Sequence, residues 1–332
     1  MLEHGGNLRD AARRYNRPLS DWLDLSTGIN PQAYPVPELA ADAWHRLPEF
    51  NPALTVAAVS YYGAPHMLAV AGTQAAIQTL PRLRASARVV VSAPSYAEHA
   101  HCWTQAGHAV REVAYDALAA AVDDCDVLVV CNPNNPTGAT VAPDILLSWA
   151  ERLAARGGWL IVDEAFGDTA SHGSVAAYTD REGLIVLRSM GKFFGLAGVR
   201  LGFVATHPTL LETLASALGP WSISGPAQQI GCAALSDHAW QAAMRLRLIE
   251  SGVRLQQLLA AHGIAATGTA LFQWWAEPAP EAFARHMAER GIWVRLFRDK
   301  ARGIRLGLPL HQHDWQRLQQ ALADWSLRDK TT

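Results

Sequence analysis

Apolar runs alternate with amphipathic stretches between about residue 66 and residue 206. Residues 142–157 have the apolar spacing of a helix that packs on one face. The apolar runs themselves are continuous rather than alternating, which indicates strands buried on both faces. Such strands joined by helices predict an α/β fold with a mainly parallel sheet sandwiched by helices. The predicted strands are 88–92, 126–131, 159–164, 184–189 and 201–206.

The pattern changes after Gly219-Pro220. Residues 226–263 are strongly helical in pattern, and shorter apolar segments after them predict a small sheet with helices. The first 35 or so residues are rich in Gly, Asn and Pro, which is typical of an arm. We therefore expect an arm at 1–35 that joins the small domain, a large domain at 36–219 and a smaller α+β C-terminal domain at 220–332.

Composition excludes several classes of protein. The chain has 332 residues, is 50% hydrophobic and carries a formal net charge of −2, so nothing favours nucleic acid as a partner. No apolar run approaches the roughly 18 residues that span a bilayer, and the polar start lacks a signal sequence. We expect a cytoplasmic protein with no membrane partner. The cysteines (Cys102, Cys125, Cys131, Cys232) are irregularly spaced, which fits reduced thiols.

Lys192 is the first candidate for chemistry. Only three of the 28 basic residues are lysines, and Lys300 and Lys330 lie among charges and are expected to be solvated. Lys192 follows a predicted buried strand, within "SMGKFFGLAGVRLG". Desolvation lowers the pKa of a lysine, and the free amine is a nucleophile. The alternative is an ordinary surface lysine in a loop.

Two neighbouring features fit a pyridoxal phosphate (PLP) site, which needs a carboxylate beside the pyridine nitrogen and a phosphate cradle. Asp163 ends the preceding predicted strand. Gly72 and Thr73 begin a predicted helix, where free N–H groups favour phosphate. Each feature alone is weak, because Gly-Thr is commonly a simple cap and Asp after a strand is commonly a cap or a metal ligand.

Other cofactors find less support in the sequence. "EHAHCW" (98–103) and "HQHD" (311–314) offer metal-ligand residue types, but neither has a partner set at zinc spacing. In the first, His99 and His101 would face different sides of a helix. We expect no metal, and no glycine-rich nucleotide motif follows a strand.

Six motifs occur in order, "GTQ", "PSY", "NPNNPTG", "VDEAF", "SMGKFFGLAGVRLG" and "IRLGLP". With this set the chain resembles the fold type I PLP-dependent enzymes of the class I/II aminotransferase superfamily over nearly its whole length. The resemblance implies PLP as cofactor, a seven-stranded-type sheet and a homodimer with active sites at the subunit interface.

The resemblance also implies roles for individual residues. Lys192 would bond the cofactor covalently, Asp163 would pair with its pyridine nitrogen, and Tyr96 would stack on its ring; these are the expected catalytic residues. The other expected cofactor contacts are Asn135 to the ring oxygen and Gly72, Thr73, Gln74, Ser189 and Arg200 around the phosphate. Arg305 would bind the substrate carboxylate as a bidentate fork.

The N-terminal segments "HGGNLRDAARRY" and "LDLSTGINPQAYP" are similar to the threonine-phosphate decarboxylase branch of cobalamin biosynthesis. This implies decarboxylation of L-threonine O-3-phosphate to (R)-1-amino-2-propanol O-2-phosphate. It also implies a second anion site, for which the candidates are His4, Asn7, Asn30 and Arg295. The alternatives are a histidinol-phosphate-type aminotransferase and a non-catalytic PLP-fold binding protein.

Three positions depart from the pattern of the superfamily. Phe166 stands where a tyrosine commonly bonds the ring oxygen, so that hydrogen bond is absent. Leu47 replaces a tyrosine that in many relatives reaches the neighbouring subunit's cofactor phosphate, and Gly191 replaces a common Ser or Thr. The core motifs therefore leave open whether the chain decarboxylates or transaminates.

Overall fold

The computed structural model describes residues 4–170, 173–298 and 301–328 of the chain. Lys300 and Lys330, which we expected to be solvated, lie outside these residues. The chain divides into two compact units. The large unit comprises Ala33–Asn135 and Ala139–Ala243, and the small unit comprises Met1–Gln32, Pro136–Gly138 and Met244–Thr332.

The boundary between the units lies later than the change of pattern near residue 220. Helix α9 (Gly225–Ser236) belongs to the large unit, where it packs on α3 (Pro52–Tyr62). Gln228 Nε2 in α9 donates a hydrogen bond to the Glu49 carbonyl over 3.1 Å. These contacts join residues far apart in sequence. The change in hydrophobic pattern near residue 220 therefore does not predict that α9 belongs to the large unit.

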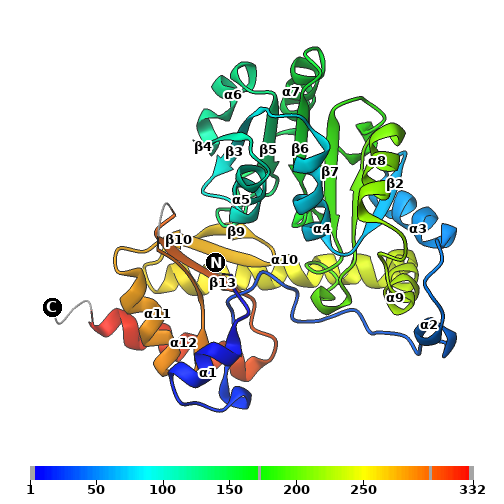
Figure 1. Cartoon of the computed structure of the whole chain (residues 1–332). Helices are drawn as coiled ribbons and strands as arrows, with labels where there is room; N and C mark the ends of the chain where they lie inside the picture. The colour runs from blue at the N-terminus through cyan, green and yellow to red at the C-terminus, as the bar shows by residue number, and fades with distance from the viewer. Residues whose placement is uncertain (1–3, 171–172, 299–300, 329–332) are drawn as a thin grey trace. The chain divides into compact units, whose positions relative to one another are not determined.

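The large unit contains a seven-stranded sheet in the order β2-β8-β7-β6-β5-β3-β4 (Figure 1). Neighbouring strands from β7 through β4 are parallel, while β8 is antiparallel to both β7 and β2. The predicted α/β class with a mainly parallel sheet is confirmed. The strands are β2 (Met67–Val70), β3 (Arg88–Ala93), β4 (Ala109–Ala114), β5 (Val127–Cys131), β6 (Trp159–Asp163), β7 (Leu184–Ser189) and β8 (Gly202–Ala205).

Strand β8 runs antiparallel because of the connection that precedes it. Residues 190–201 join β7 to β8 without an α-helix. A parallel neighbour needs a crossover that carries the chain to the opposite edge, usually through a helix. This connection instead stays at the edge where β7 ends, so β8 begins at that edge.

Helices bury both faces of the sheet. Ala76, Trp103 and Leu214, from α4 (Thr73–Thr79), α5 (Ala97–Gln105) and α8 (Pro208–Leu218), pack with one set of strand side chains. The alternate strand side chains, such as Leu128 and Val162, point to the other face and are also buried. The remaining helices of this unit are α2 (Asp42–His45), α6 (Leu118–Ala121) and α7 (Pro143–Ala154), of which α7 contacts β6.

The small unit is built on a four-stranded antiparallel sheet in the order β12-β13-β10-β9. In addition, β1 (Leu23–Asp24) of the N-terminal segment pairs in parallel with β11 (Ile292–Trp293). The strands of the sheet are β9 (Thr267–Thr269), β10 (Phe272–Ala276), β12 (Arg295–Phe297) and β13 (Gly303–Gly307). The helices are α1 (Leu8–Arg14), α11 (Pro280–Glu289) and α12 (Gln312–Arg328), with α10 (His238–Ala261) continuing from the large unit.

Among the described residues, no helix combines the length and apolar character needed to cross a membrane.

Candidate active site

The loops that follow β5, β6 and β7 deliver polar side chains to one edge of the large unit's sheet. Asp163 is the last residue of β6, Asn135 follows β5, and Lys192 follows β7. Because these strands are parallel, their carboxyl ends meet at the same edge, where ligands bind in open α/β sheets.

A cavity at this edge collects the residues that the sequence predicted for the cofactor. Its volume is about 140 Å³. All nine predicted cofactor residues line it: Gly72, Thr73, Gln74, Tyr96, Asn135, Asp163, Ser189, Lys192 and Arg200.

One end of the cavity is formed where β2 and β8 meet. Val70 at the end of β2 pairs with Gly202 at the start of β8, so the loop at Gly72 lies beside Arg200. Gly72 has φ +73° and ψ 156°, and a Cβ there would lie 2.5 Å from Arg200 Nη2. This conformation is essentially confined to glycine. The bare Gly72 backbone therefore leaves room for the Arg200 guanidinium.

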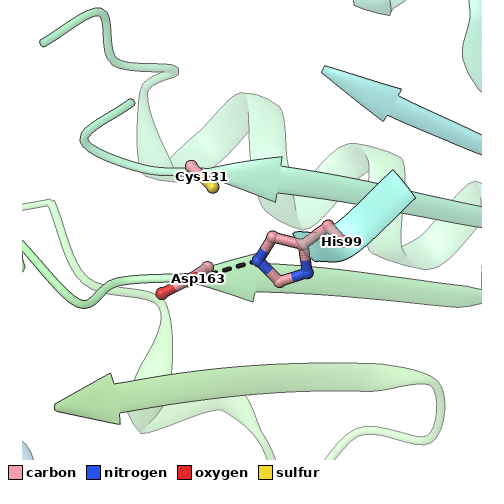
Figure 2. Close-up of side chains that lie close together, drawn as sticks. All are labelled: His99, Cys131 and Asp163. Atoms are coloured by element: carbon pink, nitrogen blue, oxygen red, sulfur yellow. Dashed lines mark hydrogen bonds and ion pairs between the residues drawn. The ribbon is translucent and has the colours of Figure 1, made fainter. Parts of the chain in front are cut away.

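Asp163 is held at both of its carboxylate oxygens. Oδ1 accepts a hydrogen bond from the Ala165 N–H over 3.0 Å. Oδ2 lies 2.9 Å from Nε2 of His99, which projects from α5 (Figure 2). The two residues are only 5% and 2% exposed. Asp163 thus has a fixed orientation at the cavity wall.

His99 is a residue of this site that the sequence analysis missed. Its helix was expected to place His99 and His101 on different sides, and the structure buries His99 and exposes His101. The donor atoms of His99, Asp163 and Cys131 lie within 4.8 Å of one another (Figure 2). The only local signal was this helical spacing, because Asp163 comes from a distant strand. The absence of a metal here stays a prediction.

The charge of His99 is set by opposing effects. Burial lowers the pKa of His99, but its hydrogen bonds to Asp163 and Cys131 outweigh burial and raise the pKa to about 10. The imidazole is therefore protonated at neutral pH and forms a buried ion pair with Asp163.

Tyr96, Gln74 and Lys192 line other parts of the same cavity. The Tyr96 hydroxyl donates a hydrogen bond to Gln74 Oε1 over 3.2 Å, and Gln74 Nε2 donates to Glu98 over 2.9 Å. Burial raises the pKa of Tyr96, so the hydroxyl stays protonated. Lys192 Nζ lies 5.4 Å from the centroid of the Phe166 ring, and this ring offers no hydroxyl to the cavity.

The predicted substrate residues belong to the small unit. Arg295 in β12 and Arg305 in β13 are cross-strand partners in the antiparallel ladder. The Arg305 side chain is buried, and Nη2 donates to the Ser26 carbonyl over 2.9 Å. Burial, followed by the charge of Arg295, lowers the pKa of Arg305. Two guanidinium groups side by side favour an anion.

The other predicted anion contacts divide into two groups. His4 and Asn7 line one cavity of the small unit together with Arg295. Asn30 is buried and does not line this cavity; its Oδ1 accepts a hydrogen bond from the Gln32 N–H over 2.8 Å.

Comparisons with known proteins agree with this geometry. The profile of the family described as "Aminotransferase class I and II" matches residues 20–308. The chain is 52% identical to the threonine-phosphate decarboxylase of Pseudomonas aeruginosa over 97% of both chains.

Two solved structures share the fold. The L-threonine-O-3-phosphate decarboxylase of Porphyromonas gingivalis matches 91% of this chain and 98% of its own, with a TM-score of 0.76 and 17% identity. The histidinol-phosphate aminotransferase of Sinorhizobium meliloti, solved with pyridoxal-5'-phosphate, matches 99% of this chain and 96% of its own, with a TM-score of 0.83 and 22% identity.

Proposed function

From the premise that the chain belongs to the class I and II aminotransferase family and, within it, to the threonine-phosphate decarboxylases, we propose that it decarboxylates L-threonine O-3-phosphate. The observation that carries the reaction type is the 52% identity to the Pseudomonas aeruginosa enzyme over nearly the full length of both chains. The product is (R)-1-amino-2-propanol O-2-phosphate, and we assign the reaction to cobalamin biosynthesis.

The residues of the large-unit cavity fit PLP, the cofactor of this family. Any Cβ at position 72 would displace the Arg200 guanidinium, the Asp163 carboxylate is fixed in orientation, and Lys192 supplies an amine. We propose that Lys192 bonds the cofactor, Asp163 holds the pyridine nitrogen, Asn135 contacts the ring oxygen and Tyr96 covers the ring. The proposed phosphate contacts are Gly72, Thr73, Gln74, Ser189 and Arg200.

Bound PLP supplies an electron sink for the electron pair released when the bond from Cα to the carboxylate breaks. The role of Asp163 is electrostatic, because a carboxylate beside the pyridine nitrogen stabilises the proton there. The overall reaction replaces the carboxylate at Cα with one proton and releases CO2.

The substrate carries two anionic groups, and the small unit supplies the cations for them. We propose that Arg305 binds the carboxylate, that Arg295, His4 and Asn7 contact the phosphate, and that Asn30 contacts the phosphate or the carboxylate. The proximity of Arg295 and Arg305 supports this assignment, because a bound anion offsets both the burial and the charge of Arg295 that lower the pKa of Arg305. Fixing both ends of the substrate would orient the bond that breaks.

The test compares two reactions of the purified protein loaded with PLP. We expect L-threonine O-3-phosphate to release CO2 and the amino-alcohol phosphate, without amino-group transfer to 2-oxoglutarate. Transfer without CO2 release would instead identify an aminotransferase, the function named for the Sinorhizobium meliloti neighbour. A spectrum with PLP that lacks the absorbance band of lysine-bonded cofactor, the band that Lys192→Ala would remove, would favour a non-catalytic binding protein.

We propose that the enzyme works as a homodimer. Support comes from large apolar side chains exposed on the large unit, where Trp44, Leu47, Phe50 and Val56 are 65% to 76% exposed. Such a group of exposed side chains is typical of an interaction surface. A mass equal to that of one chain in analytical ultracentrifugation of the holoenzyme contradicts this proposal.

We also propose a cytoplasmic location. Cys102, Cys125, Cys131 and Cys232 are all free thiols, which fits a reducing compartment.

A further inference from the structure

We propose that Glu98 is a positioning residue that acts through Gln74 on Tyr96. It fixes the side-chain amide of Gln74 with the oxygen toward Tyr96, which holds the Tyr96 hydroxyl as a hydrogen-bond donor and the aromatic ring in one orientation. The inference rests on the proposed function, in which the Tyr96 ring covers bound PLP. Glu98 itself does not line the cofactor cavity.

The first argument is the direction of the two hydrogen bonds that join these residues. Gln74 Nε2 donates to Glu98 Oε2 over 2.9 Å, and the Tyr96 hydroxyl donates to Gln74 Oε1 over 3.2 Å. A carboxylate has only acceptor atoms, so it selects the NH2 end of an amide. The oxygen end of Gln74 is then left for Tyr96, and the hydroxyl can only donate to it. The carboxylate of Glu98 thereby determines the direction of both bonds.

The second argument is that the three residues come from two helices. Tyr96 immediately precedes α5 and Glu98 lies in its first turn, whereas Gln74 lies in the first turn of α4. The two helices pack together in the large unit. Gln74 therefore bridges Tyr96 and Glu98 from outside their own helix, so a rotation of the Gln74 amide changes the support of the Tyr96 ring.

The third argument is the environment of the three side chains. All three residues are half-buried, where hydrogen bonds compete less with water. Cys102, one turn after Glu98, places its Sγ 3.9 Å from the same Oε2. Burial, followed by the charge of Glu98, raises the pKa of Tyr96, so the hydroxyl keeps its proton. Glu98 therefore supports the donor role of Tyr96 both through Gln74 and through its charge.

The orientation of the Tyr96 ring matters for the cofactor. An aromatic side chain that is fixed before PLP binds loses little conformational entropy on binding. Stacked rings also prefer an offset arrangement of their planes, so a ring that rotates away contributes less. We therefore expect Glu98 to affect the affinity for PLP and the orientation of the bound cofactor, rather than the folding of the chain.

The experiment is a double-mutant cycle that measures PLP binding to the apoprotein. Glu98→Gln keeps the shape of the side chain and allows either orientation of the Gln74 amide, and Tyr96→Phe keeps the ring and removes the hydroxyl. The matched control is Glu151→Gln, which removes a carboxylate that pairs with Arg181 over 2.8 Å on the surface of the same unit. Quenching of tryptophan fluorescence gives the dissociation constants, visible circular dichroism reports the orientation of bound PLP, and urea unfolding reports stability.

We expect Glu98→Gln to weaken PLP binding about 2- to 10-fold, the change that corresponds to one ordinary hydrogen bond, and to alter the visible circular dichroism. Tyr96→Phe should show a loss of similar size. The double variant should bind PLP no more weakly than Tyr96→Phe alone, because the hydroxyl on which Glu98 acts is already absent. Glu151→Gln should match the wild type in affinity and in visible circular dichroism. If Glu98→Gln does not fold, Glu98→Asp enters the same cycle, because it draws the carboxylate back from Gln74 by one methylene group.

Different results overturn different claims. A folded Glu98→Gln variant that binds PLP as tightly as wild type, with the same visible circular dichroism, refutes the positioning role and leaves the proposed function intact. Losses that add in the double variant also refute it, because Glu98 would then act by a route other than the Tyr96 hydroxyl. Wild-type protein that does not bind PLP at all refutes the proposed function, and the inference fails with it.

Discussion

Replacing Gly72 with alanine tests whether the approach of Arg200 to the backbone builds the phosphate end of the cavity. Gly72 has φ +73° and ψ 156°, and an added Cβ would lie 2.5 Å from Nη2 and 3.0 Å from Cζ of Arg200. The guanidinium must therefore move. The change adds one methyl group and removes no polar atom.

Two magnitudes follow from this geometry. A non-glycine residue in this backbone region costs about 1–3 kcal/mol, so Gly72→Ala should lower the free energy of unfolding of the apoprotein by about that amount. Displacing Arg200 removes a charge-assisted contact to the cofactor phosphate, which contributes about 1.5–3 kcal/mol. We expect PLP affinity to fall about 10- to 100-fold.

The assay separates these effects with a second glycine. Gly63 also has a positive φ, +70°, at the end of α3, but a Cβ there would meet nothing within 4 Å. Gly63→Ala should cost about 1–2 kcal/mol of stability and leave PLP affinity unchanged. Urea unfolding of the apoproteins gives the free energies, and fluorescence titration gives the dissociation constants.

The reasoning is refuted if Gly72→Ala binds PLP as tightly as wild type. It is also refuted if Gly63→Ala loses as much affinity as Gly72→Ala, because general destabilisation would then explain both losses.

Three further predictions concern the charged groups. Lys192→Ala should abolish both the absorbance band of lysine-bonded cofactor and CO2 release, while circular dichroism stays unchanged; a retained band of this kind contradicts the assignment of Lys192. Arg305→Lys should raise the KM for L-threonine O-3-phosphate about 10-fold or more, because an ammonium cannot form the bidentate fork; steady-state kinetics with an unchanged KM argues against Arg305 as the carboxylate site. The apoprotein should lose stability as pH rises from about 6.5 through about 10, because the raised pKa of His99 means that the folded state binds its proton more tightly than the unfolded chain. Urea unfolding across this pH range should show a smaller decline in His99→Gln.

The central strands were predictable from the sequence, because strands buried on both faces are continuous apolar runs. The runs at 126–131 and 159–164 correspond to β5 and β6. The edge strands were not predicted: β4 has exposed polar side chains within "AVREVA", and β2 has only four residues. The antiparallel direction of β8 also escaped prediction, since a run of apolar residues carries no information on strand direction.

The candidate site also contains residues that the sequence predicted and one that it did not. Lys192, Asp163 and Arg200 could be proposed from the sequence, because each lies in a short motif at a predicted strand and these motifs occur in a fixed order. His99 could not be proposed, because its role depends on Asp163, which follows it by 64 positions in the chain and approaches to 2.9 Å only in the folded protein.

The sequence by itself determined the fold class and the set of residues that can bind PLP, because the apolar runs and the order of the motifs are properties of the sequence. Only the tertiary structure decided which of these groups touch. In the folded protein Asp163 contacts His99, and Gly72 lies against the Arg200 guanidinium. Arg295 and Arg305 become cross-strand partners. Each of these contacts joins separate elements, and its energy depends on distances and burial that exist only after the strands have taken their order and register.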